Sequence, residues 1–463
     1  MAPEAFPELS DLDLKQLSAL IEQRSVTWDE QIATILLVRD LFEERRNQVS
    51  LRGLSLLMSG LDQASRVGRS ESNVAPVFVI GRGDHTAEET SRTTRPLNVL
   101  IPAHVDTVKA TDALFAMNHD AAEPDRAIGR GIYDMKGAVL NSLELATTIK
   151  VPLGMNVYFA FLIDEEKHSR GVRALMQQWP MWNQIDVVLS SEIGHVEVPP
   201  DDLAMRYILG RRGRQKHKVS LSVDPDGRGH FADGHVRSAS AALMQALHTV
   251  WERFYHGGSH MNAQPRLQLP HPLFDEETLE IGAVSSADPG QSLSLAPTSA
   301  DAYFNILSVP PRTIEQGLLE QQQLFAEINA TQAWQRHRIA YTIGPNPYET
   351  SYPAFVMPDT HPLAELTRKI LTRVAGVPAV PAYAKSVADE NLLAAAMQHS
   401  RDGQAFGVPH MGVISIPPLG GNAHRPDEWG SLHDIARVRH AFHLLIEDPE
   451  GLQKLISLKN RIS

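Results

Sequence analysis

The sequence predicts an α/β fold in which a mostly parallel sheet is covered by helices and is interrupted by an inserted α+β domain. Two observations support this prediction. Short, nearly all-apolar runs alternate with helical patterns in residues 1–209 and again after residue 345. Between these parts, the strand-like segments alternate apolar and polar residues. Strands that are apolar throughout are typical of a sheet buried on both faces, whereas alternation indicates one solvated face.

Residues 1–209 contain two helical patterns followed by four strand-like runs. The helical patterns place apolar residues at helical spacing over 11–23 and 28–44. The strand-like runs are rich in branched apolar residues and cover 76–82, 96–102, 156–163 and 185–191. Strands followed by helices in repeated order predict a mostly parallel sheet.

Residues 210–345 are predicted to form the inserted α+β domain. Its expected strands cover 214–223, 279–284, 292–297, 301–307 and 336–343, and its expected helices cover 238–254 and 313–329. Residues 346–463 return to the α/β pattern, with helices or strands expected at 361–376, 391–399, 410–417 and 431–448. The chain is therefore expected to be one α/β domain interrupted by a smaller lid.

Composition and charge exclude several classes of protein. With 463 residues, 43% of them hydrophobic and 21% charged, the chain is typical of a globular protein with sizeable cores. The formal net charge is -12 and no Lys or Arg run forms a basic stripe, so we expect no nucleic-acid partner. The acidic start lacks a signal-peptide pattern, and no window approaches the roughly 18 apolar residues that span a bilayer. We therefore expect a cytoplasmic protein with no membrane partner.

Cysteine is absent from the chain. This absence excludes disulfides, thiolate nucleophiles and zinc sites with cysteine ligands. A bound metal ion would therefore be held by histidine and carboxylate side chains, and the chain has 20 His and 55 Asp and Glu residues.

Histidines and acids follow several of the predicted strands or lie in turns. They are His104 and Asp106 in NVLIPAHVDTV, Asp134 in GRGIYDMKGAVL, Glu165 and Glu166 in FLIDEE, Glu192 in VVLSSEIG and His424 in GGNAHRPDEW. Ligands of open parallel sheets collect beyond the carboxyl ends of the strands, so we expect at least three of these groups to meet there. Two histidines and three carboxylates suit two zinc ions with one bridging carboxylate, because co-catalytic ions lie about 3.5–4 Å apart.

The motifs HVDTV, GRGIYDMKGA, DEE, SSE and AHRPDEW occur in this order, with an insert between SSE and the final histidine. In these motifs the chain resembles, over nearly its whole length, the co-catalytic zinc family that contains aminoacylase, acetylornithine deacetylase, succinyl-diaminopimelate desuccinylase and glutamate carboxypeptidase. The insert segment PTSADAYFNIL resembles a subgroup associated with arginine utilisation. The resemblance implies a zinc-exopeptidase-like catalytic domain in two parts, 1–209 and 346–463, and a lid and dimerisation domain at 210–345.

The resemblance also implies which residues hold the metal. His104, Asp134 and Glu192 would bind one zinc ion. Asp134, Glu166 and His424 would bind the other, so that Asp134 bridges the pair. Co2+ or Mn2+ would be able to substitute for Zn2+.

Further roles follow from the same resemblance. Asp106 would orient His104 through its second ring nitrogen. Glu165 would be the general base, and a partly desolvated cleft would raise its pKa, which suits a base that must become an acid within one turnover. His230 of the lid would polarise the substrate carbonyl. The family holds the peptide bond after its bridging aspartate in the cis form, so Asp134–Met135 is expected to be cis.

Each of these features also has a purely structural interpretation. A His-x-Asp at a strand end is more often a hydrogen-bonded turn than a metal site, and acids after a strand usually cap a helix, which would explain Asp164. A lid histidine such as His230 is often a solvated loop residue, and His217 and His235 lie close to it in the sequence. We favour the metal site because five such features occur together in the family order.

These roles predict a zinc-dependent hydrolase of a small amide or peptide bond, either an N-acyl amino acid deacylase or an exopeptidase. A bridging hydroxide would be the nucleophile. The alternative is a catalytically silent metal-site scaffold with a binding or regulatory role, but the complete ligand set with Glu165 intact favours the enzyme. A phosphate-transfer enzyme is least favoured, because no Gly-rich phosphate loop accompanies the site.

The residues with which family members often grip a substrate carboxylate differ in this chain. A lid Asn and a strand Arg are replaced by Ser294 and Leu307, and an isobutyl group cannot make the bidentate clamp of a guanidinium. A free substrate carboxylate would then be absent or be held otherwise, with Arg212, Arg237 and Arg312 as the candidates.

The lid is also predicted to make the protein a homodimer. A strand left unpaired at the edge of the lid sheet would be an open hydrogen-bonding template, and family members cover it by pairing lids across a two-fold axis. In that geometry His230 would serve the catalytic domain of the other subunit.

Overall fold

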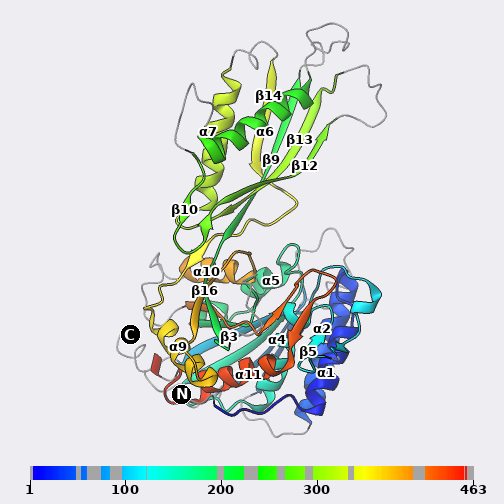
Figure 1. Cartoon of the computed structure of the whole chain (residues 1–463), viewed down its shortest axis with the longest axis vertical. Helices are drawn as coiled ribbons and strands as arrows, with labels where there is room; N and C mark the ends of the chain where they lie inside the picture. The colour runs from blue at the N-terminus through cyan, green and yellow to red at the C-terminus, as the bar shows by residue number, and fades with distance from the viewer. Residues whose placement is uncertain are drawn as a thin grey trace. The chain divides into compact units, whose positions relative to one another are not determined.

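The structure is a computed structural model that describes residues 4–47, 54–59, 75–83, 96–120, 122–194, 203–223, 238–257, 266–286, 296–331, 338–399, 412–452 and 454–455. The chain forms two compact units (Figure 1). Unit 1 comprises Met1–Arg211 and Val356–Ser463, and unit 2 comprises Arg212–Phe355. The predicted boundary after residue 345 precedes the observed one, because Tyr352 still forms a β-bridge with Arg214.

Unit 1 is built on a nine-stranded sheet with the order β1-β2-β6-β3-β7-β17-β8-β15, in which β16 also pairs with β8. The central pairs β6–β3, β3–β7 and β7–β17 are parallel, whereas β1–β2, β2–β6 and β17–β8 are antiparallel. This mostly parallel sheet with its helices confirms the predicted fold class. The bounds are β1 Leu54–Ser59, β2 Val77–Gly83, β3 Leu97–His104, β6 Met155–Leu162, β7 Val187–Ser190, β8 Arg206–Arg211, β15 Phe355–Val356, β16 Val380–Ala384 and β17 Gly412–Ser415.

The helices of unit 1 pack in groups. α4 contacts α1, α2 and α11, α9 contacts α11, and α5 contacts α10. Strands β3 and β6 are buried along their whole length, as expected for apolar strands in the middle of a sheet. The helix bounds are α1 Asp11–Glu22, α2 Trp28–Arg46, α4 Gly137–Thr148, α5 Arg170–Gln178, α9 Pro362–Ala375, α10 Asp389–His399 and α11 Leu432–Glu447.

A second, four-stranded sheet of unit 1 brings two turns together. Its order is β18-β19-β5-β4, and the pairing of β19 with β5 sets the segment before β19 beside the segment after β5. The first segment contains His424, and the second forms a kinked turn at Ile132–Lys136, in which Asp134 and Met135 have non-helical backbone angles. The remaining bounds are β4 Asn118–His119, β5 Arg126–Ile128, β18 Gly420–Gly421, β19 Trp429–Ser431, and the 3-10 turns η2 Asp112–Leu114 and η4 Trp182–Gln184.

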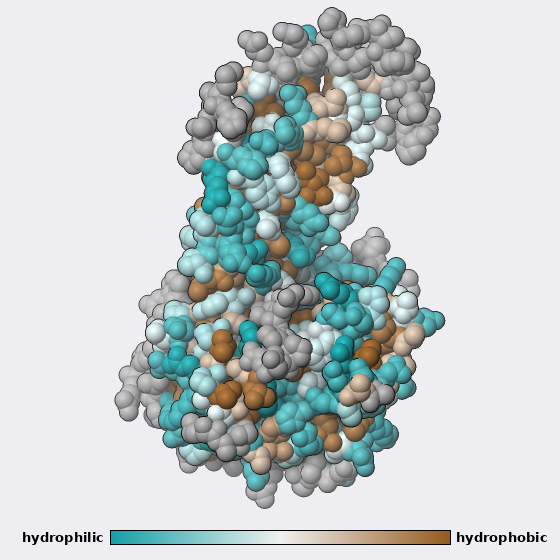
Figure 2. Space-filling model, in the orientation of Figure 1, coloured by the Kyte–Doolittle hydropathy of each residue, from teal (hydrophilic) through white to brown (hydrophobic). Residues whose placement is uncertain are grey.

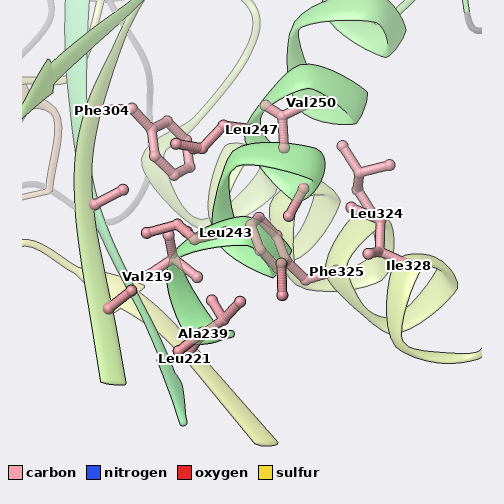
Figure 3. Close-up of a cluster of buried hydrophobic side chains, with 14 of the residues drawn as sticks. Val219, Leu221, Ala239, Leu243, Leu247, Val250, Phe304, Leu324, Phe325 and Ile328 are labelled. Atoms are coloured by element: carbon pink, nitrogen blue, oxygen red, sulfur yellow. The ribbon is translucent and has the colours of Figure 1, made fainter. Parts of the chain in front are cut away.

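Unit 2 is an antiparallel sheet with two helices on one face. The strand order is β12-β13-β9-β14, and the buried residues of β9 and β13 pack against α6 and α7 (Figure 3). Val219 of β9, Phe304 of β13, Leu243 of α6 and Phe325 of α7 are central to this core. The bounds are β9 Gly213–Val223, α6 Ala239–His256, β10 Pro270–His271, β11 Asp275–Glu276, β12 Thr278–Ser286, β13 Ser299–Ser308, α7 Ile314–Asn329 and β14 Ile339–Pro345. The strand predicted at 292–297 lies mostly outside the described residues.

Figure 2 shows apolar residues at the surface of unit 2 among mostly hydrophilic ones. Large apolar side chains that are exposed in this unit include Met244, Trp251, Val284 and Leu319. None of the helices that the structure describes is both long enough and apolar enough to cross a bilayer.

Candidate metal centre

The predicted metal ligands of unit 1 lie where neighbouring strands end. His104 is the last residue of β3, Glu166 follows β6, and Glu192 follows β7. Because β6, β3 and β7 are adjacent and parallel, their carboxyl ends meet at one edge of the sheet. Asp134 and His424 come from the two turns that the smaller sheet brings together. All five candidate ligands therefore converge in space.

The first group of candidate ligands is fully buried and consists of His104, Asp134 and Glu192. The Nε2 atom of His104 lies 3.1 Å from Oδ1 of Asp134 and 3.3 Å from Oε2 of Glu192. The other ring nitrogen, Nδ1, lies 3.0 Å from the backbone oxygen of Asp106. A proton on Nδ1 would be donated to this carbonyl, which leaves Nε2 free to bind a metal ion.

The second group shares Asp134 with the first and adds Glu166 and His424. Nε2 of His424 lies 3.0 Å from Oδ2 of Asp134 and 3.1 Å from Oε1 of Glu166. Asp134 thus turns one carboxylate oxygen to each histidine. In each group one ligand atom per residue lies within 4.8 Å of the others. An imidazole nitrogen and carboxylate oxygens from separate residues are the donors of zinc sites without cysteine, so the donor sets fit two divalent ions.

The pKa shifts in this centre reflect crowded acids with few cations. Burial and the charge of Asp134 raise the pKa of Glu192 to about 7. Burial acts to raise the pKa of Asp134 as well, but its hydrogen bonds with His104 and His424 hold it well below the usual range. Hydrogen bonds with Asp134 and Glu166 raise the pKa of His424 to about 10. Without a metal ion, Glu192 and His424 therefore hold protons more strongly than usual, and bound divalent cations would take the place of these protons.

No lysine or arginine among the described residues forms an ion pair with Asp134, Glu166 or Glu192. Three buried or half-buried carboxylates face two imidazoles instead. Burying carboxylates without a cation costs free energy, so the arrangement is explained better by metal binding than by stability alone.

Glu165 lies beside the two groups and belongs to neither of them. Burial raises the pKa of Glu165 well above its usual value, and the charges of Glu192 and Asp389 act in the same direction, against the opposite effect of His104. A half-buried carboxyl with a raised pKa holds a proton more readily than an ordinary glutamate, which suits a group that first accepts a proton and then releases it.

Asp106 braces the turn that carries Glu165 and Glu166. Its Oδ1 accepts a hydrogen bond from the backbone N–H of Glu165 at 3.2 Å, and its Oδ2 accepts one from the N–H of Glu166 at 3.1 Å. Oδ1 also lies 3.6 Å from Nδ1 of His104, farther than the backbone oxygen of Asp106 itself. Asp106 therefore contacts the backbone of Glu165 and of Glu166 as well as the ring of His104.

The structural interpretation of Asp164 as a helix cap is wrong. The N-cap position of α5 is held by Ser169, whose side chain makes no capping hydrogen bond, whereas the Asp164 side chain accepts a hydrogen bond from Nε of Arg170 at 2.6 Å. Asp164 has a φ of 66 and its carbonyl accepts the N–H of His168 and of Ser169, so it begins the tight turn that carries Glu165 and Glu166. Its charge is neutralised by Arg170 and takes no part in either ligand group.

The peptide bond between Asp134 and Met135 is cis, as expected. His230, Ser294 and Arg237 lie outside the described residues. Leu307 lies in β13 opposite Arg214 of β9.

The two remaining arginine candidates are buried in unit 2. Arg212 donates hydrogen bonds to the backbone oxygen of Phe274. Arg312 forms ion pairs with Glu277 and Glu320.

Sequence reasoning missed three buried charged residues near the centre. Asp389 is buried at the start of α10, and burial raises its pKa to about 8. Arg211 donates to the backbone oxygen of Glu192 at 3.2 Å. Glu428 accepts hydrogen bonds from the turn that carries Asp134. Only Glu428 had a signal, since it belongs to the quoted motif AHRPDEW.

The fold and this centre define a hydrolase of the type that uses a pair of metal ions. The sequence matches the family described as Peptidase family M20/M25/M40 over residues 100–448, and the chain belongs to this family. Its members are peptidases and related hydrolases that act on peptide and amide bonds, and dinuclear metal-binding peptidases are among them.

Solved structures with the same fold cover nearly the whole chain. One is a tripeptidase from Staphylococcus aureus, with a TM-score of 0.64, 12% identity, and coverage of 96% of this chain and 100% of that chain. Another is the dipeptidase Dug1p from Saccharomyces cerevisiae, with a TM-score of 0.62, 15% identity and 96% coverage of both chains. A third is the dinuclear metal-binding peptidase YXEP from Bacillus subtilis, with a TM-score of 0.58, 11% identity, and coverage of 96% and 97%. No curated protein matches the sequence.

Proposed function

We propose that the protein is a zinc-dependent hydrolase of a small N-acyl amino acid or dipeptide. His104, Asp134 and Glu192 would hold one zinc ion, and Asp134, Glu166 and His424 the other. The observation that carries this proposal is the position of Asp134, whose two carboxylate oxygens lie 3.1 Å and 3.0 Å from the two histidines. Co2+ or Mn2+ would be expected to substitute for zinc, because the same nitrogen and oxygen donors bind them.

The bound ions would supply Lewis-acid activation of water and of the scissile carbonyl. The protein would supply proton transfer and orientation. Glu165 would take a proton from the attacking water and return it to the leaving amine, for which its raised pKa is suited. Asp106 would hold Glu165 and Glu166 in register through their backbone N–H groups, and its carbonyl would keep Nε2 of His104 pointed at the metal.

The proposed substrate class follows from the solved structures of the same fold and from the arginines of unit 2. Several solved structures of the same fold are of enzymes that act on dipeptides or tripeptides, which favours an exopeptidase. A substrate carboxylate would need a cation, but Arg312 is already paired with Glu277 and Glu320. Arg212 and Arg237 therefore stay the candidates among the arginines, although a substrate without a free carboxylate also fits. The insert motif shared with the arginine-utilisation subgroup makes arginine derivatives the first compounds to test.

We further propose that the protein is a homodimer paired through unit 2, and that His230 polarises the substrate carbonyl in the other subunit. β12 lies at the edge of the four-stranded sheet, where an unpaired strand can be covered by a second copy. Mixing Glu165→Ala and His230→Ala chains after denaturation and refolding should restore activity up to about a quarter of wild type, because half of the dimers would have one complete site. A mixture as inactive as the separate mutants would contradict this role of His230. A cytoplasmic location also stays a prediction.

The proposed function is tested by a hydrolysis screen of the zinc-loaded protein. The panel would contain N-acetyl, N-succinyl and N-carbamoyl amino acids and dipeptides, including arginine derivatives of each. We expect turnover with at least one compound, and Glu165→Gln should lower kcat by about 10²- to 10⁴-fold while zinc stays bound. No turnover across the panel, with two zinc ions bound, would favour the metal-site scaffold with a binding role instead.

A further inference from the structure

Glu428 is completely buried and lies four residues after His424 in the sequence. Its Oε1 atom accepts hydrogen bonds from three backbone N–H groups of the turn that presents Asp134. The donors are the N–H groups of Gly131 at 3.0 Å, of Tyr133 at 3.2 Å and of Asp134 itself at 3.1 Å. A single carboxylate oxygen therefore accepts three hydrogen bonds from this turn.

Arg130 completes this arrangement from the other side. Its guanidinium donates to Oε2 of Glu428, and a second nitrogen donates to the backbone oxygen of Arg425 at 3.1 Å. The backbone oxygen of Glu428 in turn accepts the N–H of Gly129 at 3.2 Å. These contacts join the segment that carries His424 to the segment that carries Asp134, although the sequence separates them widely.

The turn needs glycine as well as the carboxylate. Gly131 has a φ of 85, and a Cβ atom there would lie 2.8 Å from Cγ2 of Thr107 and 3.0 Å from the Lys136 side chain. A left-handed residue packed this closely leaves the following N–H groups converging on one point, which is the geometry that binds an anion. In this protein the anion bound there is the carboxylate of Glu428.

We propose that Glu428 is a positioning residue of the metal centre, which fixes Asp134 between the two ligand groups and holds it in register with His424. This inference rests on the proposed function and deepens it by naming what keeps the bridging carboxylate in place. The contact with Arg130 fixes the position of the Glu428 side chain, and its hydrogen bonds with the three N–H groups tie the orientation of Asp134 to that position.

Glutamine at position 428 would preserve the shape of the side chain, but it could not accept hydrogen bonds from the turn and from Arg130 at the same time. Its amide oxygen could accept from the turn, but its NH2 group would then face Arg130, which has no acceptor. Either the turn or the guanidinium would lose its partner. Since Asp134 belongs to both groups, we expect the affinity for both ions to fall.

A matched control is available in unit 2. Glu277 is also completely buried, pairs with Arg312 at 3.0 Å, and accepts the backbone N–H groups of Leu269 and Val309, each at 3.1 Å. Glu277→Gln therefore makes the same chemical change in a buried arginine-paired carboxylate that touches no metal ligand. It reports the effect of losing such a pair on folding alone.

The experiment compares wild type, Glu428→Gln and Glu277→Gln by zinc titration against a chelating indicator and by the visible absorption of the Co2+-substituted proteins. We expect Glu428→Gln to weaken binding of both ions about 10- to 100-fold and to change the Co2+ spectrum, and Glu277→Gln to change neither. If Glu428→Gln does not fold, Glu428→Asp, which keeps the charge but shortens its reach, should show a smaller loss in the same direction.

Three outcomes distinguish the failure of this inference from the failure of the proposed function. A wild-type protein that binds fewer than two zinc ions would remove the proposed function. A wild type that binds two, with a Glu428 variant that matches it in affinity and in Co2+ spectrum, would overturn only the positioning role. An equal loss of affinity in Glu277→Gln would also overturn it, because the effect would then follow from folding.

Discussion

Glu192 in unit 1 and Glu277 in unit 2 are both buried glutamates, but their surroundings differ. Glu277 has a guanidinium at 3.0 Å and two backbone N–H donors to its carboxylate. Among the described residues, the carboxylate of Glu192 has only the ring nitrogen of His104 as a partner, at 3.3 Å, and the charge of Asp134 opposes its ionisation. The pKa of each is raised by burial, to about 7 for Glu192.

The difference separates a carboxylate that serves the fold from one that serves a site. Unit 2 neutralises its buried acid with its own arginine, so the pair is complete without any ligand. Unit 1 gathers Asp134, Glu166 and Glu192 without a lysine or arginine among the described residues, and leaves positive charge to be supplied. A buried acid whose only partner is an imidazole is therefore the stronger indication of a metal site.

The largest expected effect is that of Asp134→Ala, because this residue alone belongs to both ligand groups. Both ions should be lost and hydrolysis should become undetectable, whereas Glu192→Ala or His424→Ala should mainly weaken one ion. Elemental analysis of the purified variants measures the metal content. Two tightly held zinc ions in Asp134→Ala would contradict its bridging role.

A second prediction concerns stability, and it should affect unit 2 alone. Glu277→Gln removes one of the two carboxylates that pair with the buried Arg312 and leaves Glu320 as the other, which should cost about 1–3 kcal/mol of unfolding free energy. Calorimetry should show an earlier transition with an unchanged zinc content. The matching change in unit 1, Glu192→Gln, should raise the unfolding free energy of the metal-free protein. It removes a buried acid that has no lysine or arginine partner among the described residues. If Glu277→Gln and Glu192→Gln lowered the unfolding free energy by similar amounts, the proposed difference between the two buried glutamates would be wrong.

The third and smallest effect is the pH dependence of the metal-free protein. The folded pKa of Glu192, about 7, exceeds its ordinary value of 4.5, so its contribution to stability is present at low pH and is lost as the pH rises through 7. The folded pKa of His424, about 10, exceeds 6.5, so its contribution is complete below 6.5 and is lost as the pH rises toward 10. Both groups therefore make the metal-free protein less stable as the pH rises.

Zinc binding should act in the opposite direction, because its ligands bind as deprotonated groups. The difference in unfolding temperature between the zinc-loaded and the chelator-treated protein should widen by several degrees between about pH 5 and about pH 9. Scanning calorimetry at several pH values measures this difference. A difference that is independent of pH would show that protons and metal ions do not compete for these ligands.

The strands of the main sheet could be predicted because their residues are nearly all apolar, and a strand buried on both faces has little other choice. The same reasoning placed His104, Glu166 and Glu192 at one edge, since parallel neighbours end together. Asp164 was misinterpreted for a comparable reason. An acid before a helix usually caps it, but here Arg170 is close enough to take the charge and Ser169 occupies the capping position.

The sequence by itself determined the fold class, the order of the motifs and the residue types that can bind metal, because these depend on local periodicity and on side-chain chemistry. Only the tertiary structure decided that Asp134 turns one oxygen to His104 and the other to His424, and that Glu428 gathers the turn between them. The contacts of Asp134 with His424 and with Glu428 join residues that are 290 and 294 positions apart. Local patterns carry no record of them, since the geometry is set by the pairing of β19 with β5 and by the packing of the sheet.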